Sequence, residues 1–458
     1  MTFTPVDDEL AHWDATETAI RIAAGDVSAA EVMEAAVDRA RAAAPLAAVV
    51  TETYEQAVAA AGLIEGPFSG VPTFVKDLAN LAGVRTGFGT RALEDYIPTE
   101  SDPFVDLLIG TGLVSLGKSA APEFGLTATT EPLDAPPTRN PWDLDRSVGG
   151  SSGGAAALVA ARVVPIASAS DGGGSIRIPA AATGVIGLKP SRGRFPSPQG
   201  DSLPVNILTS GVLTRTIRDQ VRFYAAAEAQ LRTRRLPPVG EVTPMDRPLR
   251  IGLATENPVT QPDADVVTVV EDTARLLESL GHTVERVPLI ADETFVDDFL
   301  TYWAYLAFML RWTSKAVIDR SFDGRRMEPW TQGLVGLFAR RAHRFRGIIA
   351  SLRAFESAYA DMMRTIDVVL TPVTATTAPP IGHLAGDLPF EEHRDRVTRF
   401  VPYPAAWNVA GAPALSLPMG HGDDGLPVGV QLGGRLGEES TLLSLGLQVE
   451  AARPFPML

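Results

Sequence analysis

Apolar residues recur along the first sixty or so positions at the spacing of amphipathic helices. In AAEVMEAAVDRARAAA they lie three and four positions apart, and Ser28 precedes this run with Glu31 three residues later. Serine and glutamate at that distance form a capping box, in which each side chain bonds the backbone N–H of the other residue. The pattern therefore predicts N-terminal helices, one of which begins directly after Ser28.

A different pattern follows, in which short apolar runs are bounded by glycine and proline. The runs are GVPTFVKDLAN, GLVSLGKS and RVVPIASAS, and helical patterns such as SGGAAALVAARV lie between them. Short apolar runs with turn residues at both ends are typical of strands that are buried on both faces. Alternation of such strands with helices predicts an α/β fold.

The alternation returns in the second half of the chain. LRIGLA and the run DVVTVVEDTARLLESLGHTVERV predict strand, helix and strand, and Thr301 to Arg364 is mostly helical in pattern. IDVVLTPVTATTAPP predicts a buried strand that enters a turn. ALSLPMG and LPVGVQLGG predict two strands joined by a hairpin and followed by a helix. GHLAGDLPFEEHRDR, between residues 364 and 400, is expected to be a mobile loop.

Composition and charge narrow the class of protein. The 458 residues are 45% hydrophobic and 21% charged, as in ordinary globular proteins. The net charge of -15 repels phosphate backbones, so no nucleic-acid partner is expected. The absence of cysteine excludes disulfides and thiolate catalysis. No stretch reaches the ~18 apolar residues of a membrane span, and MTFTPVDDEL does not resemble a signal peptide, so a cytoplasmic enzyme is expected.

The segment from Ser147 to Pro190 combines glycine and serine in a way that indicates catalysis. Gly172, Gly173 and Gly174 directly precede Ser175. Three consecutive glycines have a high entropic cost and are tolerated where backbone N–H groups must approach a ligand, as in an oxyanion hole. Upstream, two serines at 151 and 152 lie between two glycine pairs. A simple flexible loop would explain one such stretch, but two in one segment favour a site.

These residues resemble the amidase signature family. Its Gly-Gly-Ser-Ser-Gly-Gly stretch appears as Gly149 to Gly154, and its Asp-x-Gly-Gly-Ser-[IV]-Arg-x-Pro stretch as Asp171 to Pro179. Its Gly-Val-Pro-x-x-x-Lys-Asp appears at residues 70–77, and WNVAGAPALSLPMG extends the likeness towards the C-terminus. The resemblance implies an α/β/α sandwich around a large twisted mixed β-sheet.

The resemblance also implies one domain, residues 1–458, with four parts. Residues 1–65 would form N-terminal helices, and residues 66–220 the signature core with the catalytic residues. Residues 221–365 would form a variable, largely helical middle. Residues 366–458 would contribute the C-terminal strands, a substrate loop and a helix.

Carried over residue by residue, the resemblance makes Ser175 the nucleophile, Ser151 a bridging serine held by a cis peptide bond, and Lys76 the base. Burial would lower the pKa of Lys76 from ~10.4, so that a neutral amine could accept a proton. The oxyanion hole would consist of the backbone N–H groups of Gly172, Gly173, Gly174 and Ser175. The nucleophile turn would be supported by Ser152, Asp171 and Arg177. No cofactor or metal is implied.

The implied activity is hydrolysis of amide bonds in small molecules, with carbamate, urethane or ester cleavage as side activities. TTEPLDAPPTRNPWDLDRSVGGSSGG is similar to bacterial amidases and to cyclic-dimer hydrolases that act on nylon oligomers. A partner-dependent amidotransferase subunit or a non-catalytic member remains the alternative, although Ile178 replaces the glutamine usual in such subunits. Whether the chain forms a homodimer stays open. The hypothesised substrate pocket, equally well interpreted as core, consists of Trp303, Tyr305, Phe400, Tyr403 and Trp407.

Two other motif matches are weaker. Gly112 to Ser119 fits the phosphate-binding pattern G-x-x-x-x-G-K-[ST], but its interior is strand-like rather than a loop that opens a helix. Gly149 to Gly153 fits the G-x-S-x-G elbow of esterases, which needs a buried strand before it and a catalytic histidine later. The preceding NPWDLDRSV is polar, and the later histidines, His393 among them, lie in no recognisable catalytic context.

Overall fold

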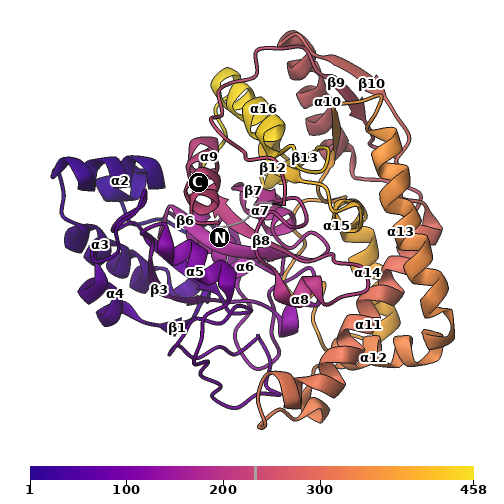
Figure 1. Cartoon of the computed structure of the whole chain (residues 1–458), viewed down its shortest axis with the longest axis horizontal. Helices are drawn as coiled ribbons and strands as arrows, with labels where there is room; N and C mark the ends of the chain where they lie inside the picture. Colours follow the sequence, from indigo (N-terminus) through magenta and orange to yellow (C-terminus); the bar gives the residue numbers. More distant parts are fainter. Residues whose placement is uncertain (232–234) are drawn as a thin grey trace.

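The computed structural model describes residues 1–231 and 235–458. An eight-stranded sheet in the order β10-β9-β11-β13-β12-β7-β8-β6 runs through the middle of the molecule (Figure 1). Strand β9 pairs in parallel with β10 and β11, and the other neighbouring pairs are antiparallel, so the sheet is mixed as predicted. The strands are β6 (Ile166–Asp171), β7 (Ile186–Lys189), β8 (Thr209–Thr214), β9 (Arg250–Leu253), β10 (Thr283–Arg286), β11 (Val368–Pro372), β12 (Ala414–His421) and β13 (Pro427–Gly433).

A three-stranded sheet in the order β1-β3-β2 extends the large one. It comprises β1 (Val49–Glu52), β2 (Pro72–Lys76) and β3 (Val114–Ser119). The N–H of Lys76 donates to Ser168 Oγ at 2.8 Å, which ties the end of β2 to β6. Most of the phosphate-binding pattern from Gly112 to Ser119 lies within strand β3. The pattern therefore does not form a loop that opens a helix. A two-stranded ribbon is formed by β4 (Arg139–Asn140) and β5 (Asp143–Ser147).

The N-terminal helices are α1 (Glu9–His12), α2 (Ala15–Ala24), α3 (Ala29–Ala42) and α4 (Tyr54–Ala60). The capping box before α3 is confirmed, since the N–H of Glu31 donates to Ser28 Oγ and the N–H of Ser28 donates to Glu31 Oε2. Helices α3 and α4 pack beside the small sheet (Figure 1), whereas Ala15 and Ala19 of α2 belong to a different core.

Helices cover both faces of the large sheet, which gives the predicted α/β/α sandwich. Neighbouring residues of a strand point to opposite faces, and in β8 Val212 packs into one core while Leu213 packs into another. The first core contains α9 (Ile217–Ala229), α10 (Ala264–Ser279) and α16 (Glu439–Ala452). The second contains α6 (Gly153–Ala160), whose glycine and alanine residues let it lie fully buried.

The remaining helices belong to the predicted signature core, the predicted variable middle and the C-terminal part of the chain. They are α5 (Pro103–Gly110), α7 (Arg177–Thr183), α8 (Pro198–Asp201), α11 (Glu293–Val317), α12 (Pro329–Arg341), α13 (Phe345–Met362), α14 (Phe390–Phe400) and α15 (Ala405–Ala410). Short 3₁₀ turns occur at Ala44–Leu46, Glu123–Gly125, Gly324–Arg326 and Ala342–Arg344. The long helices α11, α12 and α13 form one flank of the molecule, drawn in orange (Figure 1). Across the described residues, no helix combines the length and apolar character that crossing a bilayer takes.

The prediction of a mobile loop over GHLAGDLPFEEHRDR was wrong from Phe390 onward, where α14 begins. Its His393 and Phe400 are buried on one side of the helix, with Val397 packed between two cores near them. The charged residues of FEEHRDRVTRF therefore lie on the other faces of an amphipathic helix. The density of charge in this stretch obscured the helical spacing of its few apolar positions.

Candidate active site

Lys76, the predicted base, is the last residue of β2 and is 1% exposed. Its Nζ lies 2.9 Å from Ser151 Oγ and 3.0 Å from Ser170 Oγ, and it also donates to the Ser170 carbonyl at 3.3 Å. Burial lowers the pKa of Lys76 to about 7, against the opposing charge of Asp171. Desolvation disfavours the ammonium form, so a large share of the lysine is neutral near neutral pH.

Ser151, the predicted bridging serine, lies just before α6 and is 2% exposed. The Gly150–Ser151 peptide bond is cis, as the resemblance implied. Close to this hydroxyl is Gly125, with a φ of +70°, where an added Cβ would lie 3.0 Å from Ser151 Oγ. Beside it, Ser152 Oγ donates to the Ser170 carbonyl at 3.3 Å, which joins this turn to the end of β6.

Ser175, the predicted nucleophile, lies in the short turn between β6 and α7. Gly174 in this turn has a φ of +130°, and a Cβ there would lie 2.6 Å from Ile178 Cδ1 and 2.7 Å from Pro404 Cβ. At Gly173 a Cβ would lie 3.1 Å from the Phe299 ring. Close contacts and left-handed backbone thus explain the glycines in front of Ser175.

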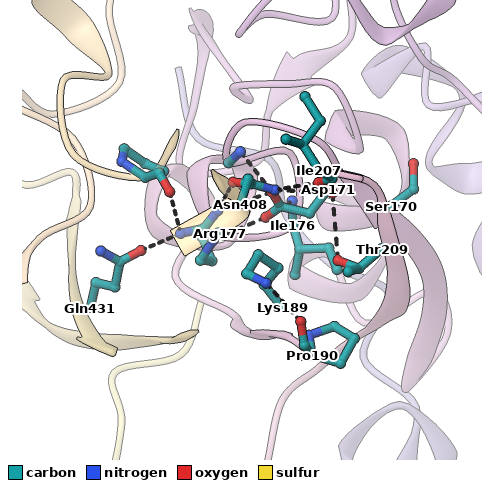
Figure 2. A network of polar contacts seen from close by, with 12 residues as sticks. Ser170, Asp171, Ile176, Arg177, Lys189, Pro190, Ile207, Thr209, Asn408 and Gln431 are labelled. Atoms are coloured by element: carbon teal, nitrogen blue, oxygen red, sulfur yellow. Dashed lines mark hydrogen bonds and ion pairs between the residues drawn. The ribbon is translucent and has the colours of Figure 1, made fainter. Parts of the chain in front are cut away.

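The turn is anchored by a buried network around Asp171 (Figure 2). Arg177 Nε and Nη2 each donate to the Asp171 carboxylate at 3.0 Å, and both side chains are 0% exposed. Asn408 on α15 donates to Asp171 Oδ1 at 2.8 Å, and Arg177 Nη1 donates to Gln431 Oε1 on β13 at 2.6 Å. The C-terminal part of the chain therefore fixes the position of the nucleophile turn.

Asp171 also accepts hydrogen bonds from the backbone of the turn itself. Oδ1 accepts from Gly174 N–H at 2.7 Å and Oδ2 from Ile176 N–H at 3.1 Å. The N–H of Gly174 is therefore taken up by Asp171, which is at odds with its predicted place in the oxyanion hole. For Gly172, Gly173 and Ser175 that role remains a prediction.

Two opposing effects set the ionisation of Asp171. Burial would raise the pKa of this carboxyl, but Arg177 and the hydrogen bonds hold the pKa well below its usual range. The group is thus a permanent anion that orders the turn, and a carboxylate without a proton cannot serve as a general acid.

Ser175 and Gly173 line a cavity whose other walls are largely apolar. Four aromatic rings line it, contributed by Phe295, Phe299, Trp303 and Trp330. None of its lining residues, all within the described part of the chain, carries a charge. Such a cavity accommodates an uncharged, apolar group next to the predicted nucleophile.

Only one of the five hypothesised pocket residues lines this cavity. Trp303 lines the cavity, and its indole N–H donates to the Leu126 carbonyl at 3.0 Å. The other four pack within the protein and do not line this cavity; they are Tyr305, Phe400, Tyr403 and Trp407. Tyr403, for example, is 0% exposed and donates its hydroxyl to the Thr255 carbonyl. Their interpretation as core residues is the one that the packing favours.

Several residues at the site had no role in the sequence prediction. Ser170 directly precedes Asp171, and its hydroxyl contacts Lys76. Asn408 lies in the stretch WNVAGAP. An asparagine among these apolar residues was the available sign of a buried polar contact. Within the described residues, no three His, Asp or Glu side chains gather closely enough to hold a metal ion.

Comparison with known proteins gives a consistent result along the chain. A family model described as "Amidase" matches residues 31–443. The chain is 43% identical over 457 residues to a Mycobacterium tuberculosis protein named "Putative amidase AmiC", covering 98% of this chain and 96% of that one. It is 32% identical to 6-aminohexanoate-cyclic-dimer hydrolase of Paenarthrobacter ureafaciens, covering 96% and 95%. A solved structure of 6-aminohexanoate cyclic dimer hydrolase superposes with a TM-score of 0.90 at 30% identity over 98% of both chains.

Proposed function

The chain belongs to the amidase signature family and is a hydrolase of carbon–nitrogen bonds, and we propose that it cleaves small-molecule amides through an acyl-enzyme on Ser175. The observation that supports this mechanism most is the 2.9 Å contact between Lys76 Nζ and Ser151 Oγ, whose side chains are both buried. A lysine with a pKa of about 7 is a competent base at neutral pH.

In the first step, neutral Lys76 takes the proton of Ser151 while Ser151 takes that of Ser175. Ser175 Oγ then attacks the substrate carbonyl. The resulting oxyanion accepts hydrogen bonds from the backbone N–H groups of Gly172, Gly173 and Ser175. Loss of one such donor costs ~3–4 kcal/mol in comparable enzymes, so a small change in this turn should have a large effect on turnover.

In the second step the C–N bond breaks and the departing nitrogen needs a proton. An amide anion is too basic to leave, so Ser151 returns a proton to the nitrogen and is reprotonated by the Lys76 ammonium. Water then hydrolyses the acyl-enzyme by the same route in reverse. Ser151 and Lys76 thus carry the proton of Ser175 to the departing nitrogen, and later carry a proton of the attacking water back to Ser175.

Carbamates and esters present a carbonyl of similar geometry and are proposed as further substrates. An activated ester needs little protonation of its leaving group, whereas an amide needs it fully. Ser151→Ala should therefore lose amide hydrolysis to a greater extent than hydrolysis of an activated ester. Equal losses on both substrates would argue against proton delivery by Ser151.

The deciding experiment is intact-mass analysis after treatment with a fluorophosphonate. We expect a single adduct on the wild type and none on Ser175→Ala, while Lys76→Ala stays folded by circular dichroism and labels far more slowly. No adduct on the folded wild type would contradict the proposal and favour a subunit that needs partner chains. Size-exclusion chromatography of the active protein would also distinguish a monomer from a homodimer.

A further inference from the structure

His393 connects α14 to the cavity that contains Ser175. Its side chain is fully buried, and its ring stacks on the cavity-lining Trp330 with a centroid distance of 4.1 Å. The two ring nitrogens have different partners. Nδ1 lies 3.0 Å from the Ala385 carbonyl oxygen, and Nε2 lies 3.0 Å from Thr127 Oγ1.

These two contacts fix the tautomer of the histidine. A carbonyl oxygen only accepts, so Nδ1 must carry the hydrogen. Burial, together with the nearby Arg396 and His383, lowers the pKa of His393 to about 4, although the bond to Ala385 acts in the opposite direction. The ring is therefore neutral at physiological pH, and Nε2 presents a lone pair to Thr127.

The hydrogen-bond direction at Thr127 follows from that tautomer. A hydroxyl has one hydrogen and two lone pairs, and Thr127 must donate its hydrogen to Nε2 of His393. Thr127 lines the cavity and is only partly buried. Towards the cavity, its oxygen can only accept a hydrogen bond.

We propose that Thr127 is a specificity residue that accepts a hydrogen bond from an N–H of the bound substrate, and that His393 is the positioning residue that keeps Thr127 an acceptor. The inference rests on the proposed function of Ser175. The expected substrates are uncharged, apolar amides or carbamates that bear an N–H. Esters and N,N-disubstituted amides lack that donor, so the lone pairs of Thr127 Oγ1 are desolvated without accepting a hydrogen bond from the substrate.

Matched substrates test the inference directly. The probes are a 4-nitroanilide, its N-methyl analogue and a 4-nitrophenyl ester, all with the same hydrophobic acyl group. Each variant is compared with the wild type by the ratio of kcat/KM for anilide to that for ester, in which intrinsic reactivity cancels. Thr127→Val should lower this ratio about five- to tenfold, the usual weight of a neutral hydrogen bond, and Thr127→Ser should retain it.

A second variant tests the coupling to His393. His393→Phe keeps a flat ring against Trp330 but removes the acceptor, so the Thr127 hydroxyl is free to turn and donate. This variant should also lower the anilide-to-ester ratio, and the double variant with Thr127→Val should lower it no further than Thr127→Val alone.

Equal losses on anilide and ester in Thr127→Val would overturn the inference, because a purely structural hydroxyl affects both substrates alike. Additive losses in the double variant would overturn the role of His393. If His393→Phe fails to fold, Thr127→Val and Thr127→Ser still decide whether Thr127 accepts a hydrogen bond from the substrate N–H. Fluorophosphonate labelling of the wild type distinguishes failure of this inference from failure of the proposed function. If Ser175 is labelled but Thr127→Val leaves the anilide-to-ester ratio unchanged, only the role of Thr127 is refuted. If Ser175 is not labelled, the proposed function is refuted.

Discussion

Arg177 donates two hydrogen bonds of 3.0 Å to the Asp171 carboxylate, and both side chains are fully buried. The pair lies within the segment that carries Ser175, because Asp171 ends β6 and Arg177 begins α7. Its remaining hydrogen-bonding groups are used by Asn408, Gln431 and the backbone of the turn. The attraction within a buried ion pair offsets the desolvation of its charges only when further hydrogen bonds take up its remaining polar atoms.

Arg177→Met should therefore be strongly destabilising. It leaves the Asp171 carboxylate buried without its counter-charge, which costs about 3–5 kcal/mol of unfolding free energy in comparable cases. The measurement is urea-induced unfolding followed by circular dichroism. As a control, Arg364→Met removes an ion pair with Asp361 whose two side chains are mostly exposed, and it should have a much smaller effect. Similar losses in both variants would contradict the importance of the buried pair.

Amide hydrolysis should depend on pH through Lys76. Its reactive form is the neutral amine, which is populated above the pKa of about 7, so kcat/KM should rise as the pH increases through 7 and then level off. Steady-state rates in buffers from pH 5.5 to 9 would show this.

Lys189 provides the control for that assignment. It is also fully buried, with a pKa lowered to about 7 by burial and by Arg177. Its Nζ donates to the Pro190 carbonyl (Figure 2), whereas Lys76 Nζ contacts Ser151. Lys189→Met should keep the inflection near pH 7. If the inflection disappears in that variant, the base is not Lys76.

Gly174→Ala should abolish most activity and lower stability. The new methyl group would clash with Ile178 and Pro404, and the φ of +130° is strained for any residue with a Cβ. Gly347→Ala is the matched control, since it lies in α13 with no atom within 4 Å of the added methyl. The control should be neutral or slightly stabilising, because alanine is the better helix former. Thermal unfolding and turnover of both variants give the comparison.

Ser170→Ala should reduce turnover by about five- to tenfold without unfolding the protein. It removes one of the two hydroxyl groups that hold Lys76 Nζ, and so loosens the base by roughly one hydrogen bond. Ser170→Thr retains the hydroxyl and should remain near wild-type activity. A loss of equal size in both variants would mean that packing at this position matters, and not the hydroxyl.

The elements around Lys76 and Ser175 could be predicted from the sequence because local signals agreed there. The buried run PTFVK, followed by Asp77, marked β2 and placed Lys76 at its end, and the glycines before Ser175 marked a turn. Both are short-range patterns, in which residue type and spacing alone restrict the structure.

The cavity was harder to predict, because its residues come from helices and loops far apart in the chain. Trp303 and Trp407 are both aromatic residues in helices, yet one lines the cavity and the other is buried against Tyr359. Nothing in their neighbouring sequence distinguishes the two. The pairing of Thr127 with His393 joins residues 266 positions apart and is visible only in the folded chain.

The anchoring of the nucleophile turn also has a consequence for protein synthesis. A nascent chain that has reached residue 190 already contains Lys76, Ser151 and Ser175, whereas Asn408 and Gln431 are synthesised much later. Because a chain is made from its N-terminus onward, the turn has no support from α15 or β13 until both of these elements have been synthesised. We therefore expect a chain that stops before Asn408 to lack activity, although it contains Lys76, Ser151 and Ser175.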